Sequence, residues 1–295
     1  MVDPAGRRTR IAVAGATGRV GSTLTGLLAS DPVNVVALTR RPDAVQLPSG
    51  VATAAINFDQ PETLSEALRG TERLFLAHGT SARQVANEIA VIDAAIAAGV
   101  SHIVKLSAMG PPTRLHPFDW HMAIEAHLAA CDIGYTVLRP GSFVNILARA
   151  ATPVATNTWG GAAGDGRVNL IDVHDVAAAA RVALLDGSFL RAQRAYHLTG
   201  PAAVSMPEVA DELSRLLGRS VTYQHRTPAE HRDVLIASGL DNMVAGLLLG
   251  LDQLFREGVL AETTNTVSDL TGKEARPVAG WLRDNISAFL MASTS

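Results

Sequence analysis

The sequence predicts an α/β fold, in which a doubly wound parallel sheet is followed by a smaller C-terminal α/β lobe. Short apolar runs alternate with helical patterns through the first half of the chain, and repeated β–α units of this length imply parallel strands with helices on both faces. After about residue 150 the chain becomes rich in Gly, Ala and Thr. We therefore predict a sheet domain over residues 1–150 and a lobe over residues 151–295 that packs on the sheet and is not an independent domain.

The first element is a buried strand that runs into a glycine-rich turn and a helix. Residues 11–14 are apolar, and Gly15, Gly18 and Gly21 follow before a helical pattern of leucines. Gly15 permits a sharp turn with positive φ, Gly18 lets a pyrophosphate approach the helix N-terminus, and Gly21 lets helix and strand pack closely. A turn that binds nothing is the alternative, but the coincidence of strand, turn and helix favours a dinucleotide site.

Further strands and helices alternate along the chain. Strands are expected at residues 33–38, 52–56, 73–77, 102–106 and 135–138, and helices at 61–69, 82–98 and 120–130. The helix over 82–98 should bury Val85, Ile89, Ile92 and Ile96. In the lobe we expect a loop over 152–165, a strand at 195–198 and helices over 176–185, 205–217, 228–238, 241–255 and 273–290. Asp172 and Asp175 could suggest acid–base chemistry, but Asp175 is better interpreted as the cap of the helix over 176–185.

Ligands of doubly wound sheets bind beyond the carboxyl ends of the strands. The second strand ends at Thr39, Arg40 and Arg41, with no carboxylate before Asp43. Arginine suits a ribose 2′-phosphate in charge and in bidentate geometry, so the stretch favours NADP(H) over NAD(H). A solvated basic turn is the alternative.

Asn57 and Phe58 follow the third strand, where the adenine would lie, although Phe58 could equally belong to the core. Other strand ends supply further candidates. The predicted cofactor-binding residues are Gly15, Thr17, Gly18, Arg19, Val20, Thr39, Arg40, Asn57, Phe58, His78, Gly79, Ser107, Pro140 and Phe143.

Composition limits the class of protein. The net charge of −3 gives no reason to expect a nucleic-acid or membrane-surface partner. Cys131 is the only cysteine, so no internal disulfide is possible, and no C-x-x-C or H-E-x-x-H pattern indicates a metal site. We expect no secretory leader and no membrane span, and hence a cytoplasmic protein that acts on a small molecule. The oligomeric state stays open, with a homodimer as one alternative.

Several motifs together resemble the NmrA-like branch of the atypical short-chain dehydrogenase/reductases. They are GATGRVG at residues 15–21, LTRRP at 38–42, YTVLRPGSF at 135–143, DVHDVA at 172–177, LLGR at 216–219 and LTGK at 270–273. The resemblance covers nearly the whole chain in the order of the family. It implies a Rossmann domain, a small C-terminal substrate lobe and NADP binding. Members of the family include quinone reductases of the type 2 kind and catalytically silent redox sensors.

The chain departs from the family where short-chain dehydrogenases generally hold a Tyr and, four residues later, a Lys. Alignment places Pro117 at the Tyr position and His121 at the Lys position. A proline has no proton to donate, so a carbonyl reductase of the usual mechanism is not expected. His121 is the catalytic candidate because imidazole titrates near neutral pH, although it could instead cap the helix or contact the ribose. The resemblance implies that Ser107 corresponds to the upstream Ser of the family, and Lys105 is expected to point to solvent.

Three functions are consistent with these residues. The first is an NADPH-dependent reductase that passes hydride directly to an activated acceptor such as a quinone or an enone, since solvent can protonate the product. The second is a non-catalytic NADP(H) sensor that acts through a protein partner, and the third is a scaffold with a vestigial site. The glycine turn and Arg40 argue against the third. Apolar residues of the lobe argue for a substrate and so for the reductase; they are Leu235, Ile236, Leu240, Met243 and Leu247.

Overall fold

The core of the molecule is a parallel sheet, as the sequence predicts, but it has seven strands and not six, because the strand expected in the lobe at residues 195–198 joins the edge of this sheet. The computed structural model describes residues 8–111 and 117–290. Each adjacent pair of strands is parallel, and the spatial order is the doubly wound one, with one strand added at the edge. The strands are, in this order, β3 (Ala52–Ala55), β2 (Asn34–Thr39), β1 (Arg10–Ala14), β4 (Arg73–Leu76), β5 (His102–Leu106), β6 (Gly134–Pro140) and β10 (Gln193–Leu198).

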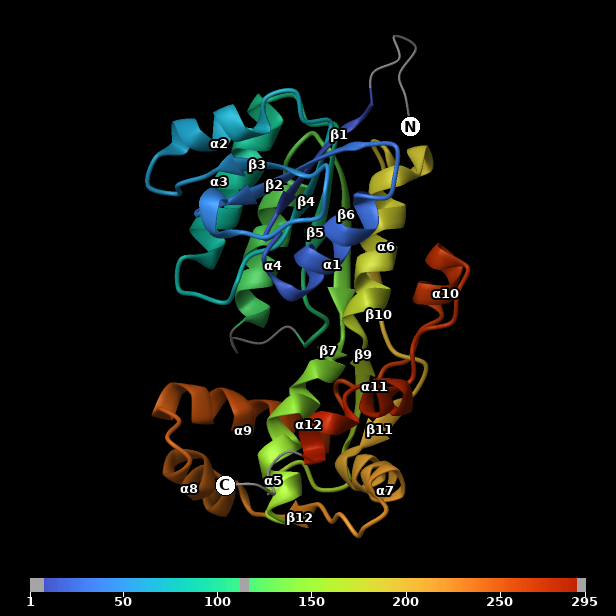
Figure 1. Cartoon of the computed structure of the whole chain (residues 1–295). Helices are drawn as coiled ribbons and strands as arrows, with labels where there is room; N and C mark the ends of the chain where they lie inside the picture. The colour runs from blue at the N-terminus through green and yellow to red at the C-terminus, as the bar shows by residue number, and fades with distance from the viewer. Residues whose placement is uncertain (1–7, 112–116, 291–295) are drawn as a thin grey trace.

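Helices cover both faces of this sheet (Figure 1). One face carries α1 (Arg19–Leu28) and α6 (Val173–Leu185), and the other carries α2 (Pro61–Leu68), α3 (Gln84–Ala97) and α4 (Phe118–Ala129). Because successive side chains of a strand point to opposite faces, Leu74 and Phe75 of β4 enter different cores. Two separate apolar layers therefore hold the strands in place.

Most of the remaining elements form the lobe below the sheet (Figure 1). Its strands are β7 (Ser142–Phe143), β9 (Arg167–Ile171) and β11 (Ala203–Ser205) in one small sheet, and β8 (Gly160–Gly161) and β12 (Gln224–His225) in another. Its helices are α5 (Ala151–Ala155), α7 (Met206–Leu217), α8 (Pro228–Ala237), α9 (Asn242–Arg256), α11 (Val278–Asp284) and α12 (Ile286–Leu290), whereas α10 (Thr266–Thr271) packs against α6 and β10 of the main sheet. Short 3-10 turns lie at η1 (Pro42–Ala44), η2 (Val144–Ala150) and η3 (Gly187–Phe189).

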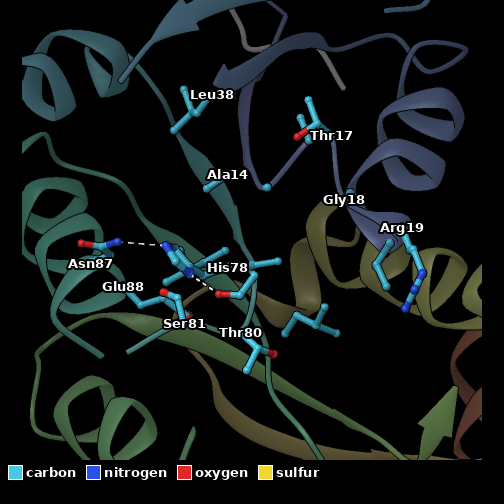
Figure 2. A pocket seen from close by; sticks show the side chains of 18 of the residues that line it. Ala14, Thr17, Gly18, Arg19, Leu38, His78, Thr80, Ser81, Asn87 and Glu88 are labelled. Carbon is cyan, nitrogen blue, oxygen red and sulfur yellow. Dashed lines mark hydrogen bonds between the residues drawn. The ribbon is translucent and has the colours of Figure 1, made fainter. Parts of the chain in front are cut away.

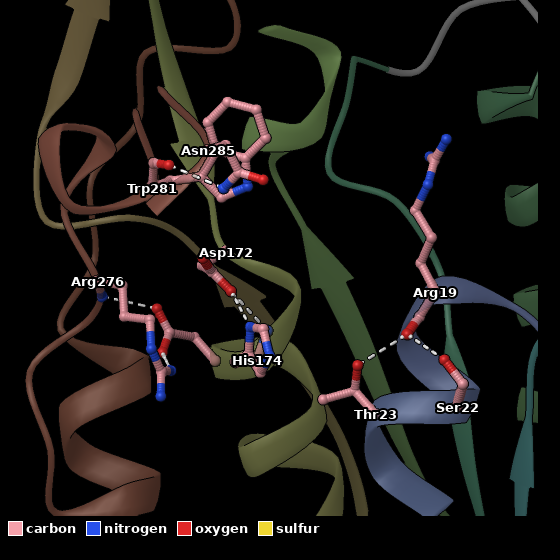
Figure 3. Close-up of polar contacts among 9 residues, drawn as sticks. Arg19, Ser22, Thr23, Asp172, His174, Arg276, Trp281 and Asn285 are labelled. Atoms are coloured by element: carbon pink, nitrogen blue, oxygen red, sulfur yellow. Dashed lines mark hydrogen bonds and ion pairs between the residues drawn. The ribbon is translucent and has the colours of Figure 1, made fainter. Parts of the chain in front are cut away.

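The cap of helix α6 differs from the prediction. Asp172, not Asp175, is the N-cap, and its carboxylate accepts a hydrogen bond from the His174 backbone N–H at 2.8 Å (Figure 3). Asp175 lies inside the first turn and accepts a hydrogen bond from the Arg276 backbone N–H at 2.7 Å, besides pairing with the Arg276 side chain. Burial raises the pKa of Asp175, and these contacts with Arg276 oppose that rise. Asp175 therefore ties the C-terminal segment to the sheet.

Three other local predictions are wrong. Residues 152–165 are not all loop, since they include most of α5 and all of β8. The segment 273–290 is not one helix, because Pro277 stands at the N-cap of α11 and the chain breaks again before α12. The buried side of α3 is rotated from the expected one: Ile96 is exposed, whereas the polar residues Gln84, Asn87 and Glu88 are buried.

The division of the chain at residue 150 stays a prediction. Helix α6 and strand β10, from the second part of the sequence, belong to the layers of the main sheet. The sheet is therefore built from both parts of the chain. Within the described residues, no helix combines the length and the apolar character that crossing a bilayer requires.

Candidate active site

A cleft of about 1460 Å³ opens at the carboxyl ends of the parallel strands. It lies where β1 and β4 are neighbours and the strand order reverses, which is the usual ligand position in this architecture. The structure brings every predicted site residue to this one cleft. They are Gly15, Thr17, Gly18, Arg19, Val20, Thr39, Arg40, Asn57, Phe58, His78, Gly79, Ser107, His121, Pro140 and Phe143.

The glycine turn forms one wall of the cleft (Figure 2). Gly15 has φ +77°, and its carbonyl accepts a hydrogen bond from the Gly18 N–H at 2.9 Å. A Cβ on Gly21 would lie 2.1 Å from the Gly15 carbonyl oxygen, so only glycine lets α1 approach the turn this closely. Gly18 is the N-cap of α1 and provides no side-chain cap. The first N–H groups of α1 therefore face the cleft, where they suit a phosphate.

The basic stretch after β2 lines the same cleft. The Arg41 backbone N–H donates to Thr39 Oγ1 at 3.2 Å, which fixes the start of the turn. The side chains of Arg40 and Arg41 are exposed, and within the described part of the chain no hydrogen bond or ion pair engages the Arg40 guanidinium. Arg40 is thus available to an anionic ligand.

Asn57, Phe58 and His78 form another wall of the cleft. Asn57 Oδ1 accepts the Asp59 backbone N–H at 3.0 Å, and the rings of Phe58 and His78 meet edge to face with centroids 5.5 Å apart. Phe58 both lines the cleft and packs partly against the core of α2 and α3, and its contact with the adenine stays a prediction. An ion pair of 2.6 Å between Arg83 and Asp59 joins the two loops of this wall.

His78 is held in one tautomer by two partners (Figure 2). Its Nδ1 lies 2.6 Å from the Gly79 carbonyl oxygen, which can only accept, so Nδ1 carries the proton. Its Nε2 then accepts from Asn87 Nδ2 at 2.9 Å. Asn87 was not among the predicted site residues, although a polar residue on the buried side of a helix close to a strand end is a pattern that can indicate a site.

The surroundings of His121 also differ from the prediction. Lys105 does not point to solvent: it is fully buried, forms an ion pair of 2.9 Å with Glu88, and places its Nζ 3.2 Å from His121 Nδ1. Burial first, and then the charge of Lys105, lower the pKa of His121 to about 3. The imidazole is therefore neutral near pH 7, contrary to the expectation that it titrates there. It can donate a hydrogen bond but cannot act as a charged general acid.

Ser107 and Pro117 complete this end of the cleft. The Ser107 hydroxyl donates to Glu125 of α4, and Arg139 Nε donates to the two oxygens of the same carboxylate at 3.2 Å and 3.1 Å. The hydrogen bond with Glu125 raises the pKa of Arg139. Pro117 is the N-cap of α4. No tyrosine or lysine is among the described residues that line the cleft, so no Tyr–Lys pair of the usual kind is present there.

The expected apolar substrate surface is mostly elsewhere. Helix α9 reaches the cleft at Leu251, whereas none of the five apolar residues named from the sequence is part of its lining. Met243 and Ile236 are instead exposed, at 71% and 40%. The prediction failed because helix α8, which holds Leu235 and Ile236, buries no residue and packs on α9 rather than over the cleft.

Comparison with known proteins agrees with this geometry. The family model described as NAD(P)H-binding matches residues 15–183. The NAD(P)H azoreductase of Xenophilus azovorans is 32% identical over 95% of this chain and 99% of its own. Quinone oxidoreductase 2 of Escherichia coli is 32% identical, over 91% and 96%. The (4-alkanoyl-5-oxo-2,5-dihydrofuran-3-yl)methyl phosphate reductase of Streptomyces griseus is 34% identical, over 95% and 99%.

Solved structures show the same fold. An NADPH-dependent quinone oxidoreductase of Escherichia coli, crystallised with NADPH, superposes with a TM-score of 0.84 at 29% identity, covering 94% of this chain and 99% of that one. The transcriptional regulator NmrA superposes with a TM-score of 0.76 at 18% identity, covering 95% and 97%, which is a likeness of fold alone. The chain therefore belongs to the NAD(P)H-binding family and is an NAD(P)H-dependent reductase.

Proposed function

We propose that this protein is an NADPH-dependent reductase that passes hydride to an electron-poor acceptor such as a quinone or an enone, without a Tyr–Lys pair. The observation that supports this choice most directly is the end of the cleft at Ser107, Pro117 and His121. A prolyl residue stands where a proton donor would be, and the nearby imidazole is neutral. Such a site suits acceptors that take hydride without prior protonation.

The residues of the cleft fit NADPH on observations of the structure. The N-terminus of α1 suits the pyrophosphate because no side chain caps its first N–H groups, and only glycine permits the turn before it, since a Cβ on Gly15 would lie 2.6 Å from the Ala77 carbonyl oxygen. Arg40 suits the 2′-phosphate because its exposed guanidinium has no anionic partner among the described residues. Asn57 and Phe58 suit the adenine.

When bound, NADPH supplies a hydride from its nicotinamide ring. The residues of this chain bind and orient the reactants. His121, as a neutral imidazole, would donate a hydrogen bond from Nε2 to the acceptor oxygen on which negative charge develops. With a quinone, one hydride and one proton from water give the hydroquinone, so no protein acid is consumed.

The names of the relatives support an acceptor of this class. They designate an azoreductase, a quinone oxidoreductase and a dihydrofuranyl phosphate reductase. An azo group, a quinone and a ring alkene conjugated to a carbonyl all accept hydride at an electron-poor centre. The small-molecule substrate proposed here belongs to the same class, and NADPH chemistry together with one unpaired cysteine fits the cytoplasm.

The test is NADPH oxidation with a panel of quinones and enones, and with a simple ketone as the matched poor acceptor. We expect turnover with the activated acceptors and little with the ketone. His121→Phe should lower kcat by roughly 10²–10³-fold, the cost of one donor to a developing oxyanion, whereas His121→Gln should retain part of the rate because its amide can still donate.

Ketone reduction as fast as quinone reduction would contradict the proposal, since it requires a proton donor to replace the Tyr–Lys pair, which the described residues of the cleft lining do not contain. NADPH binding without turnover of any activated acceptor would instead favour the sensor function. The replacement of the catalytic tyrosine by Pro117 would then explain why the protein is inactive. If His121→Phe were as active as the parent protein, His121 would have no catalytic role.

A further inference from the structure

A buried ion pair lies beside the cleft, and cofactor binding does not explain it: Glu88 is one of the lining residues, whereas Lys105 is not. Lys105 of β5 and Glu88 of α3 are both completely buried, with Nζ and Oε2 2.9 Å apart. Glu88 is also fixed by Gln84, whose Nε2 donates to Oε1 at 2.9 Å. Charges removed from water are costly even when paired, and an apolar pair of similar volume would fill this space without that cost. Packing alone therefore does not explain why the chain holds this ion pair here.

The ammonium of Lys105 makes contacts that match its three donors. Besides Glu88 it contacts the Leu106 carbonyl oxygen, and its Nζ lies 3.2 Å from His121 Nδ1. An ammonium has three N–H groups and no lone pair, so it can only donate. Burial lowers the pKa of Lys105, and the Glu88 carboxylate opposes that shift and so favours the charged amine.

These contacts determine where His121 keeps its proton. Because Lys105 donates to Nδ1, that nitrogen must be the acceptor, and the proton of the neutral ring is on Nε2. Nδ1 faces the buried Lys105, whereas the ring lines the cleft. Nε2 has no hydrogen-bond partner within the described residues and remains available to a ligand.

We propose that Lys105, held in place by Glu88, is a positioning residue that locks His121 as the Nε2–H tautomer and aims this N–H at the acceptor in the cleft. The inference rests on the proposed function, because it assigns the task of the N–H to the same hydride transfer. Lys105 itself touches neither cofactor nor acceptor, since it is no part of the cleft lining. It acts through the imidazole.

The direct test is the ¹⁵N NMR spectrum of the imidazole nitrogens in the full chain, labelled at histidine and saturated with NADP⁺. The signals of His121 are assigned by their loss in His121→Gln. We expect a pyrrole-type nitrogen at Nε2 and a pyridine-type nitrogen at Nδ1. The reverse pattern, or a charged ring at pH 7, would overturn the proposal whether or not the protein reduces quinones.

The double variant Glu88→Gln/Lys105→Met removes both buried charges at once, so no carboxylate is left without a partner. We expect the Nδ1 signal of His121 to shift as its donor is lost, and kcat with a quinone to fall roughly tenfold, the scale of one hydrogen bond. KM for NADPH should change little. A lower unfolding temperature with an unchanged His121 spectrum and unchanged kcat would show that the pair is only structural.

A matched control removes another ion pair, between two residues that do not line the cleft. Asp175 and Arg276 join α6 to the segment before α11, and neither lines the cleft. Asp175→Asn/Arg276→Met should lower stability but leave the His121 nitrogen signals in place. If the control moved those signals as much as the Lys105 variant does, the effect would be a general loosening of the fold, and the proposed lock would be wrong. Absence of quinone turnover in the parent protein, with the expected tautomer present, would refute only the proposed function.

Discussion

Helix α1 contains two glycines whose replacement by alanine should have opposite effects. A Cβ on Gly21 would lie 2.1 Å from the Gly15 carbonyl oxygen and 2.7 Å from its carbon, against 3.4 Å or more in ordinary contact. Both atoms are backbone of the glycine turn and cannot swing aside. A Cβ on Gly26, in the same helix, would meet nothing within 4 Å. The two variants therefore share the change in helix propensity and differ only in the clash.

The magnitudes follow from these distances. Replacing Gly by Ala inside a helix stabilises a protein by about 1 kcal/mol. Overpacking costs roughly 1–3 kcal/mol, and the upper end applies here because the neighbour is backbone. Gly21→Ala should thus lose about 2 kcal/mol and Gly26→Ala should gain about 1 kcal/mol. For a chain of this size we expect the Tm to fall by roughly 4–8 °C in the first and to rise by roughly 2–4 °C in the second.

The assay is thermal unfolding followed by circular dichroism without cofactor, so that ligand binding does not contribute to the Tm. Calorimetric titration with NADPH then measures whether the displaced turn still binds. We expect weaker binding in Gly21→Ala and unchanged binding in Gly26→Ala. If Gly21→Ala were as stable as Gly26→Ala, the close approach of α1 to the turn would not constrain this helix, and the reasoning would fail.

Three further predictions concern the cofactor and pH. Gly18→Val should fold, because its Cβ would lie 3.2 Å from only one backbone oxygen. Calorimetry should nevertheless show weaker NADPH binding, and normal binding would mean that the cofactor does not lie over this turn. Arg40→Ala should weaken NADPH far more than NADH, and equal losses would refute the assignment to the 2′-phosphate. Burial lowers the pKa of His102 to about 4 and that of His121 to about 3, so the unfolded chain binds more protons below its ordinary histidine pKa. The free energy of unfolding should therefore fall as pH drops from about 6.5 to 4, by roughly 1.4 kcal/mol per pH unit for each histidine. Urea unfolding measured at several pH values should show that the free energy of unfolding changes less with pH in His121→Gln than in the parent protein. An unchanged pH dependence would mean that His121 titrates normally.

Most of the sheet and of the cleft lining could be predicted from the sequence, because the signals involved are local. A glycine turn between an apolar run and a helix determines its own geometry through φ and steric room, and each strand end follows from the limits of an apolar run. Parallel strands then bring their ends to one edge, so residues as distant as Gly15 and Phe143 could be assigned to one site.

The charge and the neighbours of His121 were decided only by the tertiary structure. The apolar spacing of α3 predicts that Ile96 is buried, and the position of Lys105 near a strand end predicts that its side chain reaches water. Both fail because Glu88 and Lys105, from different elements, meet in the interior and each makes the burial of the other tolerable. The burial that gives His121 its low pKa depends on the same long-range packing. Likewise Asp175 could not be linked to Arg276, 101 residues away, from local sequence. The sequence by itself therefore determined the first six strands of the sheet, the glycine turn and the location of the cleft. The protonation of the groups around the cleft depends on long-range packing, which buries oppositely charged groups together.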